Sequence, residues 1–162
     1  MNDEILATID ASGPRRIMAT TMLFVVGALA IYVALSRPPA LHWLVFLLGI
    51  GGFSIWLGVR LWQATTHRIE LTERELRSSD GAVIAEVADV VAVDRGVFAF
   101  KPSNGFLIRT AVKGPRSWRP GLWWRMGHRI GIGGVTPGAQ SKSMAEILAI
   151  MIARRDAGQG NV

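Results

Sequence analysis

The most distinctive chemistry in this chain lies in one basic stretch of its second half. No acidic residue occurs between Asp94 and Glu146, whereas lysines and arginines recur throughout the same stretch. Its densest part, KGPRSWRPGLWWRMGHR, interleaves arginine with tryptophan. Basic side chains close to an anionic leaflet gain about 1 kcal/mol each, and tryptophan adds apolar area while its N–H stays hydrated. The predicted lipid- or partner-binding residues are Lys113, Arg116, Trp118, Arg119, Trp123, Trp124, Arg125 and Arg129.

The sequence allows three interpretations of this basic stretch. It forms a loop that lies on anionic lipid headgroups, it docks an acidic region of a protein partner, or its tryptophans are core residues and its arginines are simply solvated. Mixtures of basic and aromatic residues also bind single-stranded nucleic acid, but a membrane-tethered position disfavours this use. The predicted partners are therefore the membrane itself and either anionic lipids or a membrane protein complex.

No other pattern of residues indicates catalysis or a cofactor. The chain contains no cysteine, which excludes disulfides, thiolate metal sites and iron–sulfur clusters. His42, His67 and His128 are scattered, and none has metal-ligand spacing with a nearby carboxylate. The glycines of residues 131–134 lack the third glycine and the helix start of a dinucleotide site. We therefore expect no cofactor, no metal and no catalytic residue; an enzyme with an unrecognised site is the alternative.

Two apolar segments near the start of the chain have the length and composition of transmembrane helices. Residues 17–35 and 41–59 contain no Asp, Glu, Lys or Arg. At a rise of about 1.5 Å per residue, each spans roughly the 30 Å hydrocarbon core of a bilayer. Residues 36–40 between them include two prolines that end the first helix, and they are too few to form a domain. The sequence predicts a transmembrane hairpin over residues 17–62.

Flanking positive charges predict the orientation of this hairpin. Arg15 and Arg16 precede the first helix. Arg60 and Arg68 follow the second helix, whereas the connection holds Arg37 alone. Because lysine and arginine are enriched on the cytoplasmic side, both termini are expected in the cytoplasm. Aromatic residues that favour the two membrane interfaces lie toward the helix ends; they are Tyr32, Trp43, Trp56 and Trp62.

Small residues in the two apolar segments predict where helices pack closely. Ala30 and Ala34 form one pair four residues apart. Ser54 and Gly58 form another, with Gly51 nearby. Small side chains let helix backbones approach each other in lipid. These residues are predicted to pack the two helices together; docking of a glycine-rich helix face against another membrane protein is the alternative.

From about residue 63 the chain changes to short alternating runs separated by turn residues, which is typical of antiparallel strands. Asp80-Gly81 predicts a two-residue hairpin turn, and Asn104-Gly105 predicts a second tight hairpin. A loop rich in Pro, Arg and Trp is expected before the last strand. The expected strands are 68–72, 75–78, 82–84, 90–93, 97–100, 106–109 and 129–132.

An amphipathic helix is expected to close this domain. Ser143 and Glu146 have the spacing of a capping box at a helix start. Arg154 and Arg155 lie where cations interact favourably with the helix dipole. Apolar residues recur at helical spacing between these ends, and they are predicted to pack on the strands. This face consists of Met144, Ile147, Leu148 and Met151.

This order of elements resembles the bacterial pleckstrin-homology-like (PH-like) domain membrane proteins. The residues that carry the resemblance are Thr66-His67-Arg68-Ile69, Glu73-Arg74-Glu75-Leu76, the stretch 87–93 and the helix at 143–155. The expected fold class is a membrane α-helical hairpin plus an α+β, mainly-β PH-like domain with six or seven antiparallel strands and a C-terminal helix. The expected organisation is a cytoplasmic segment at 1–16, the hairpin at 17–62, the PH-like domain at 63–156 and a tail at 157–162.

The resemblance implies a binding or scaffolding module in a bacterial inner membrane, because this family has no shared active site to transfer. We therefore expect a membrane-anchored module that contacts anionic lipid headgroups or a membrane protein partner. The alternative is an accessory or assembly subunit of a membrane protein complex that acts through its transmembrane hairpin. A resemblance of fold does not decide between these functions.

Overall fold

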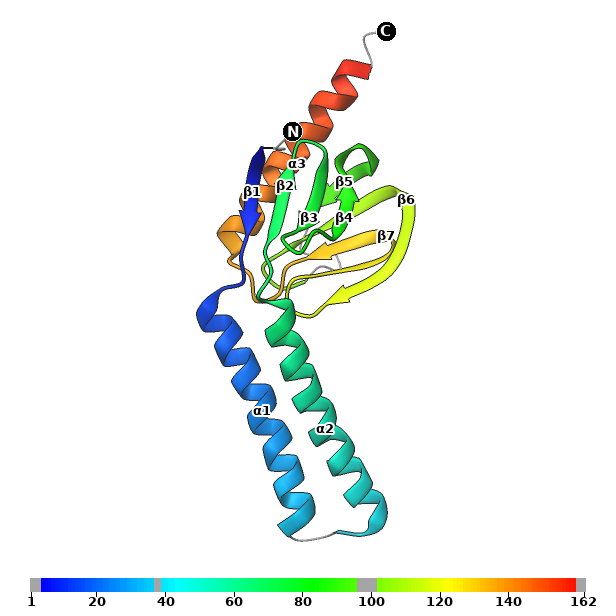
Figure 1. The fold of residues 1–162 in the computed structure, drawn as a ribbon. Coiled ribbons are helices and arrows are strands. Elements are labelled where there is room, and N and C mark those ends of the chain that lie inside the picture. Colours follow the sequence, from blue (N-terminus) through cyan, green and yellow to red (C-terminus); the bar gives the residue numbers. More distant parts are fainter. Residues whose placement is uncertain (1–3, 37–38, 96–101, 160–162) are drawn as a thin grey trace.

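The computed structural model describes residues 4–36, 39–95 and 102–159. Two long helices project as a rod from one end of a β-rich domain, and a third helix lies along that domain (Figure 1). This arrangement agrees with the coarse prediction of a helical hairpin plus a domain of antiparallel strands and a C-terminal helix. Two predicted features lie outside the described residues: the flanking charge of Arg37 and the strand at 97–100.

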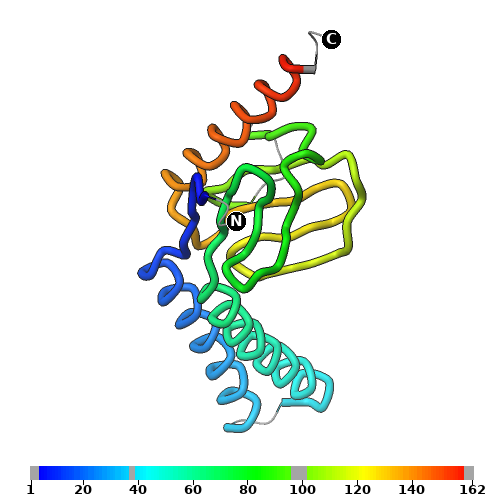
Figure 2. Tube along the Cα trace, turned by 45° about the horizontal axis from the view of Figure 1, so that its top comes forward, coloured from blue at the N-terminus to red at the C-terminus, as the bar shows by residue number. Residues whose placement is uncertain are grey.

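The helical hairpin is inserted between two neighbouring strands of one sheet. β1 (Ile5–Ile9) precedes α1 (Gly13–Ser36), and β2 (Ile69–Thr72) follows α2 (Leu41–Ala64). β1 and β2 pair in antiparallel register, with the ends nearest to the helices opposite each other. Figure 2 shows the same adjacency from a second direction. The chain therefore leaves the domain through α1 and returns to it through α2 at the same end.

β1 is a strand that the sequence does not predict. It lies in residues 1–16, which are expected only as a cytoplasmic segment. Its run ILATI is apolar without the strict alternation of a half-buried strand. Ile9 is nevertheless fully buried in the domain core, and β2 supplies the pairing partner of the strand. A short apolar run cannot be assigned to a sheet until its partner is known, since isolated strands are not stable.

The two long helices touch along a narrow seam of small side chains. The buried residues of α1 recur every seven residues, and those of α2 from Gly51 to Leu61 are spaced by three, four and three residues. This is the period of a left-handed coiled coil, and it keeps one face of each helix against the other. Ala30 lies half-buried beside the seam. The seam contains Thr20, Gly27 and Ala34 on α1, and Gly51, Ser54, Gly58 and Leu61 on α2.

Two glycines allow the closest approach within this seam. A Cβ atom added to Gly27 would lie 2.7 Å from Ile55 Cγ1 and 2.9 Å from the Gly51 carbonyl oxygen. A Cβ atom added to Gly51 would lie 3.0 Å from the Gly27 carbonyl oxygen. Gly49 and Gly52, in contrast, have nothing within 4 Å of such an atom. The glycines of α2 therefore divide between the seam and the outer surface of the rod.

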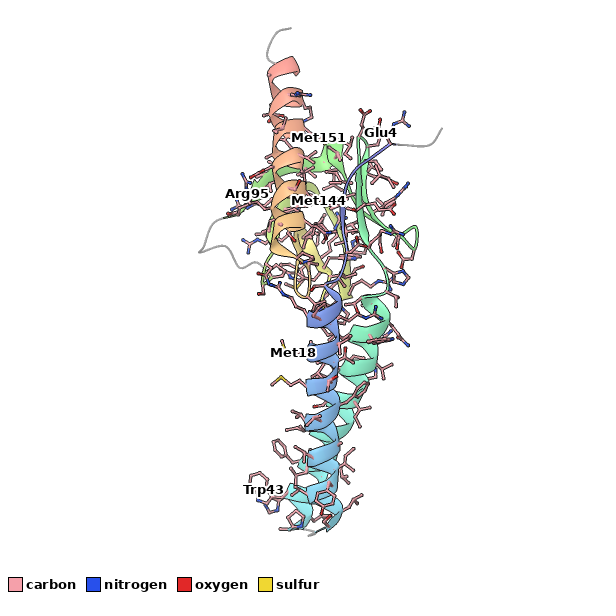
Figure 3. All side chains as sticks on the ribbon, turned by 90° about the vertical axis from the view of Figure 1, so that its left-hand side faces the viewer. Glu4, Met18, Trp43, Arg95, Met144 and Met151 are labelled. Atoms are coloured by element: carbon pink, nitrogen blue, oxygen red, sulfur yellow. The ribbon has the colours of Figure 1, made fainter. Side chains whose placement is uncertain are left out.

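The outer surface of the rod is apolar. Only 17% of the most apolar stretch of α1 and 22% of that of α2 is buried, so neither is a core helix of the folded domain. Each helix has 24 residues, or about 36 Å at 1.5 Å per residue. Exposed apolar side chains, Met18 and Trp43 among them, project along its length (Figure 3). Both helices are long and apolar enough to cross a membrane, and they contain the spans predicted at 17–35 and 41–59.

The described strands form two antiparallel sheets, ordered β1-β2-β3-β4 and β5-β6-β7. A single 3-10 turn, η1 (Val87–Asp89), joins the last strand of the first sheet to the first strand of the second. Strands expected near 68–72, 75–78, 82–84 and 90–93 are present, with shifts of one or two residues at some ends. The remaining bounds are β3 (Glu75–Ser78), β4 (Val83–Glu86), β5 (Val90–Asp94), β6 (Phe106–Arg119) and β7 (Trp123–Ile132).

The turn between β3 and β4 differs from the predicted two-residue hairpin. The Ser78 N–H donates to the Ala82 carbonyl at 2.9 Å, so the loop contains residues 79–81. Gly81 has a φ of 84°, whereas Asp80 does not have a positive φ. A three-residue hairpin requires the left-handed conformation only at its last position. Glycine at that position explains the turn signal, but the predicted loop length is wrong.

The loop expected between the strands at 106–109 and 129–132 is also wrong, because the structure has a long β-hairpin there. β6 and β7 pair from Phe106 at one end to the turn at the other. Two irregularities interrupt the register, and the second lies after Gly114, where Pro115 occurs. Proline and glycine suggest a loop in the sequence. A bulge tolerates both residues because the ladder needs no N–H at that point.

α3 (Gly138–Gln159) begins earlier than the capping box at Ser143 and Glu146 predicts. Pro137 precedes the helix, and its carbonyl accepts a hydrogen bond from the Ser141 N–H at 3.2 Å. Proline suits a helix start because its fixed φ is helical and its missing N–H would have no partner there. The predicted capping pair therefore lies inside the helix rather than at its end.

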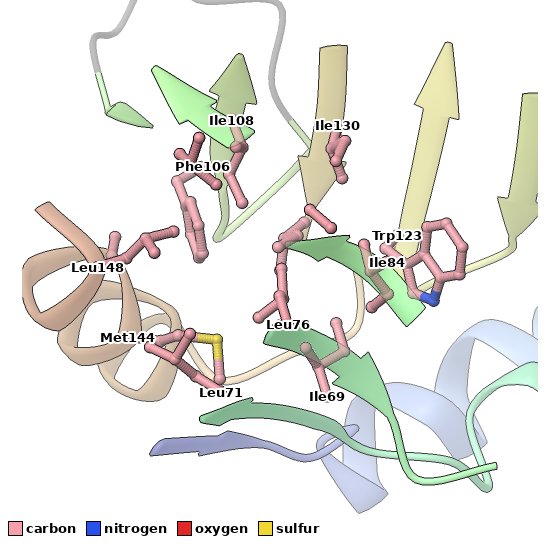
Figure 4. Close-up of a cluster of buried hydrophobic side chains, with 14 of the residues drawn as sticks. Ile69, Leu71, Leu76, Ile84, Phe106, Ile108, Trp123, Ile130, Met144 and Leu148 are labelled. Carbon is pink, nitrogen blue, oxygen red and sulfur yellow. The ribbon is translucent and has the colours of Figure 1, made fainter. Parts of the chain in front are cut away.

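The hydrophobic core lies between the two sheets and α3. Met144 and Leu148 of α3 are fully buried and point toward Phe106 and β2 (Figure 4). At the other end of α3, Arg155 donates hydrogen bonds to three backbone carbonyls within residues 87–90. The helix is therefore attached to the strands by apolar contacts along its face and by a guanidinium group near its end.

Replacing Gly51 by leucine is expected to destabilise the hairpin, whereas the same change at Gly52 is not. A side chain at position 51 meets the Gly27 carbonyl, and overpacking of this kind costs about 1–3 kcal/mol. Gly52 is the matched control, because its substitution raises helix propensity equally but meets open space. The measurement is the thermal unfolding midpoint of the full chain in detergent. Equal midpoints for Gly51→Leu and Gly52→Leu would contradict the seam.

Candidate functional site

The residues predicted to bind lipid or a partner do not form one surface. Successive side chains of a strand point to opposite faces, so the hairpin of β6 and β7 divides them. Trp118 is 56% exposed, whereas Trp123 on the neighbouring strand is 5% exposed. Trp124 is half-buried, with its ring against the backbone of Gly131. The exposed members besides Trp118 are Lys113, Arg116 and Arg129.

Trp123 belongs to the domain core, which corrects its prediction as a binding-surface residue. It lies in the same cluster as Ile84, beside which Figure 4 shows its ring. In the described part of the chain its indole nitrogen has no hydrogen-bond partner. The reason is the register: Trp123 pairs with Arg119, and Trp124 pairs with Trp118. A shift of one residue would exchange the two faces, and the local sequence alone does not fix this choice.

Arg125 connects parts of the domain, so its guanidinium is not a free surface charge. It donates to the Ile84 carbonyl at 2.7 Å and to the Val112 carbonyl at 3.3 Å. The side chain passes directly over Gly114, where any Cβ atom would collide with it. Arg125 thereby joins β4 of the first sheet to the β6–β7 hairpin of the second. Its donors satisfy one backbone carbonyl from each side of this connection.

Two arginines at the start of α1 attach the helical rod to the domain. Arg15 donates to the Thr136 carbonyl at 2.9 Å, in the segment that follows β7. Arg16 lies 3.8 Å from the centroid of the Trp62 ring and donates to the Trp62 carbonyl at 3.1 Å. A guanidinium in this position combines a cation–π contact with a charged hydrogen bond. The sequence predicts these arginines only as cytoplasmic flanks.

The turn between β6 and β7 rests directly on the end of α2. Gly121 has a φ of 79°, and an added Cβ atom would lie 2.6 Å from Leu61 Cδ1 and 3.2 Å from Thr65 Cγ2. Both the backbone conformation and the available space therefore select glycine. Beside it, the Ser12 N–H donates to the Val135 carbonyl at 2.8 Å. The rod and the domain thus meet in a packed junction rather than through a flexible linker.

A pocket of about 230 Å³, here called the junction pocket, opens between α2 and the end of β6. Trp56 and Arg60 line it from α2, and Trp118 and Arg119 line it from β6. Two guanidinium groups and two indole rings suit an anionic group that is attached to an apolar one. The remaining lining residues are Gln63, Ala64 and Pro120.

Arg119 is oriented by an ion pair with Asp80, whose carboxylate lies 2.7 Å from it. Partial burial acts to raise the pKa of Asp80. Hydrogen bonds from Ser78 and from the Ala82 N–H, together with the charges of Arg119 and His67, outweigh this effect. The pKa of Asp80 therefore lies below its ordinary value, and the group is ionised at neutral pH.

Arg60 has a different environment from Arg119. Its guanidinium carbon lies 5.6 Å from the centroid of the Trp56 ring. No carboxylate within residues 4–36, 39–95 and 102–159 forms an ion pair with it. The two pocket arginines and Asp80 together carry one net positive charge. The junction pocket therefore offers room and charge for one singly charged anion.

Two other hollows of the domain have different chemistry. One of about 430 Å³ lies at the start of α3 and carries Arg95, which forms an ion pair with Glu146 at 3.2 Å. A groove of about 480 Å³ lies between Leu6 of β1 and Ile150 of α3 and is largely apolar. Among the residues that the structure describes, no group of three or more His, Asp or Glu side chains could hold a metal ion.

Comparison with protein-family models, curated proteins and solved structures finds no match for this chain. The structure itself shows two long apolar helices, antiparallel sheets of four and three strands, and a C-terminal helix. The resemblance to PH-like domains therefore stays a prediction. The junction pocket is accordingly assessed from its own geometry and charge.

Half of the junction pocket comes from residues that the sequence predicts for other roles. Trp56 is expected as an interface anchor, and Arg60 is expected as a cytoplasmic flank. Nothing in the sequence indicates that Trp118 and Arg119 return to the end of the second apolar segment. One feature of the sequence does indicate that Trp56 and Arg60 act together. Arg60 is the first charged residue after that segment, and it follows Trp56 by about one helical turn.

Replacing Asp80 by asparagine is expected to lower the free energy of unfolding at neutral pH by about 0.2–1 kcal/mol, the range of partly exposed ion pairs. Because the pKa of Asp80 is lowered in the folded state, its stabilisation is present above the ordinary carboxyl pKa of 3.8. It is lost as pH falls through the lower pKa of the folded state.

Denaturant unfolding of the full chain in detergent measures this difference between the parent and Asp80→Asn. The difference should shrink at a pH well below 3.8, because both proteins are then uncharged at this position. A difference that persists in acid, or its absence at neutral pH, would contradict the role assigned to the ion pair.

Proposed function

We propose that this chain is an integral protein of the bacterial inner membrane whose PH-like domain is a non-catalytic binding and scaffolding module at the cytoplasmic surface. α1 and α2 cross the bilayer, and both termini lie in the cytoplasm. The apolar outer surface of the rod supports insertion, since large exposed apolar areas are not stable in water. Arginines next to the domain end of the rod support the cytoplasmic orientation.

The observation that carries this proposal is the insertion of the rod between β1 and β2. Two adjacent strands of one sheet continue into the two helices, with only residues 10–12 and 65–68 between. The domain therefore cannot move far from the end of the rod. If the rod crosses the bilayer, the same face of the domain always meets the membrane surface, which is the property a membrane-surface module needs.

Anionic lipid headgroups are the proposed ligand of that face. The chain carries a formal net charge of +6, and the junction presents tryptophan and arginine side chains from both the rod and the domain. Arg60 and Trp56 occupy the end of α2, where the hydrocarbon core gives way to headgroups. Tryptophan and arginine are the side chains that suit this boundary, because each has an apolar part and a polar part.

A second candidate function is that of an accessory subunit that acts through its transmembrane hairpin. The observation in its favour is the outer face of the rod, where α1 carries an open apolar hollow lined by Ile17 and Met22. On the outer face of α2, Gly49 and Gly52 leave open space, because nothing lies within 4 Å of an added Cβ atom at either position. A stable partner that co-purifies in mild detergent and is lost in Gly52→Leu, without a change in stability, would favour this function.

The orientation can be tested by single-cysteine labelling, since the natural chain has no cysteine. Ala40→Cys places a thiol in the connection between the helices, and Ala157→Cys places one near the end of α3. A membrane-impermeant maleimide should label Ala40→Cys in intact spheroplasts and Ala157→Cys only after permeabilisation. The unchanged parent is the blank. Labelling in the reverse order, or recovery of the chain in the soluble fraction, would contradict the proposal.

Headgroup contact can be tested by hydrogen exchange of the full chain in lipid nanodiscs. Amides of residues 118–122 should exchange more slowly in phosphatidylcholine mixed with phosphatidylglycerol than in phosphatidylcholine alone, because bound headgroups restrict opening of the turn. Residues 73–74, at the opposite end of β2, serve as the internal control. Equal exchange of the turn in both lipids would contradict contact with anionic headgroups.

A further inference from the structure

We propose that the junction pocket binds the phosphodiester of one anionic glycerophospholipid, with Arg60 and Arg119 as its ligands. This inference rests on the proposed membrane orientation and gives the headgroup contact a defined site. It differs from a diffuse attraction between a basic surface and a charged leaflet, because it requires two particular arginines and a stoichiometry of one lipid.

The convergence of two arginines from separate elements is the first argument. Arg60 extends from α2 and Arg119 from the end of β6, and both line the same cavity of about 230 Å³. A guanidinium group presents parallel N–H donors that match two phosphate oxygens, and this arrangement makes arginine a preferred phosphate ligand. The packing of Gly121 against Leu61 keeps the two elements together, so the pocket is formed before any ligand arrives.

The charge of the pocket selects the kind of phosphate. Asp80 forms an ion pair with Arg119 and neutralises one of the two cations. The single remaining positive charge matches a phosphodiester, which carries one negative charge, better than a phosphomonoester, which carries nearly two at neutral pH. A zwitterionic headgroup would add an ammonium group to a pocket that already holds two guanidinium groups. The charge therefore favours a lipid such as phosphatidylglycerol.

The position of the pocket along α2 matches the depth of lipid phosphates. Residues 41–59 contain no Asp, Glu, Lys or Arg, and Arg60 follows at once. A phosphate at Arg60 would place its acyl chains against the apolar surface of α2. Trp56 and Trp118 are 46% and 56% exposed, and they flank the route between the pocket and the hydrocarbon. Amphipathic indole rings are favoured at this level.

Native mass spectrometry of the full chain in detergent, titrated with phosphatidylglycerol or phosphatidylcholine, tests the proposal. The parent should bind a first phosphatidylglycerol more tightly than a first phosphatidylcholine. Arg60→Gln and Arg119→Gln should each weaken the first phosphatidylglycerol about tenfold, since each removes charge-assisted hydrogen bonds. Arg74→Gln is the matched control, because Arg74 is exposed at the opposite end of the domain. Thermal unfolding midpoints show whether each variant keeps the parent fold. If Arg119→Gln does not keep the fold, the comparison of Arg60→Gln with Arg74→Gln still tests the site.

Three results would overturn this site. Equal weakening by all three substitutions, or by none, would show a diffuse contact and leave the proposed headgroup function intact. Displacement of phosphatidylglycerol by soluble glycerol 3-phosphate would assign the pocket to a free phosphate instead of a lipid. A parent that does not distinguish the two lipids would remove both the site and the proposed contact with anionic headgroups.

Discussion

The antiparallel pairing of β1 with β2 determines where both long helices leave the domain. Neighbouring strands lie about 4.8 Å apart, whereas packed helices lie about 8–10 Å apart. The helices that continue from these strands must therefore lie unusually close together, or the linkers at 10–12 and 65–68 must absorb the difference. Gly27 and Gly51 let the two backbones approach near the middle of the rod without intervening side chains. At the domain end, the linkers accommodate the change from strand spacing to helix spacing.

The junction between rod and domain meets this requirement with specific contacts rather than with flexible chain. Arg16 joins the start of α1 to Trp62 near the end of α2, and Gly121 brings the β6–β7 turn onto α2. Their combined effect is that α2 and β6, which are far apart in sequence, share one rigid corner. A pocket between two elements can hold a ligand in a fixed geometry only if the elements do not move relative to each other. The contacts that join rod to domain therefore also preorganise the junction pocket.

The features that could be predicted from the sequence are those with a local physical signal. The apolar segments require no partner to be identified, and β2 to β5 are short strand-like runs bounded by turn residues, so each could be found individually. β1 could not be found because it is a strand only when paired with β2, and the whole rod lies between these two strands in the sequence. The β6–β7 hairpin was hidden by Pro115 and its neighbouring glycine, which suggest a loop unless the bulge is known. The junction pocket depends on the return of the β6–β7 hairpin to the end of α2, so the sequence predicts its individual residues but not their convergence.

The basic, tryptophan-rich stretch also shows why composition overestimates a binding surface. Arginine and tryptophan are abundant there for at least two reasons: Trp123 fills the core, and Arg125 satisfies carbonyls between sheets. Trp123 adds no apolar area to the surface, and the guanidinium of Arg125 already donates to two backbone carbonyls. Trp118 and Arg119 are accessible to solvent, but they form a pocket only together with Trp56 and Arg60, which belong to the predicted membrane hairpin. Charge density along the sequence therefore indicates a strand that lines the junction pocket, whereas the pocket itself requires the contact between that strand and the end of α2.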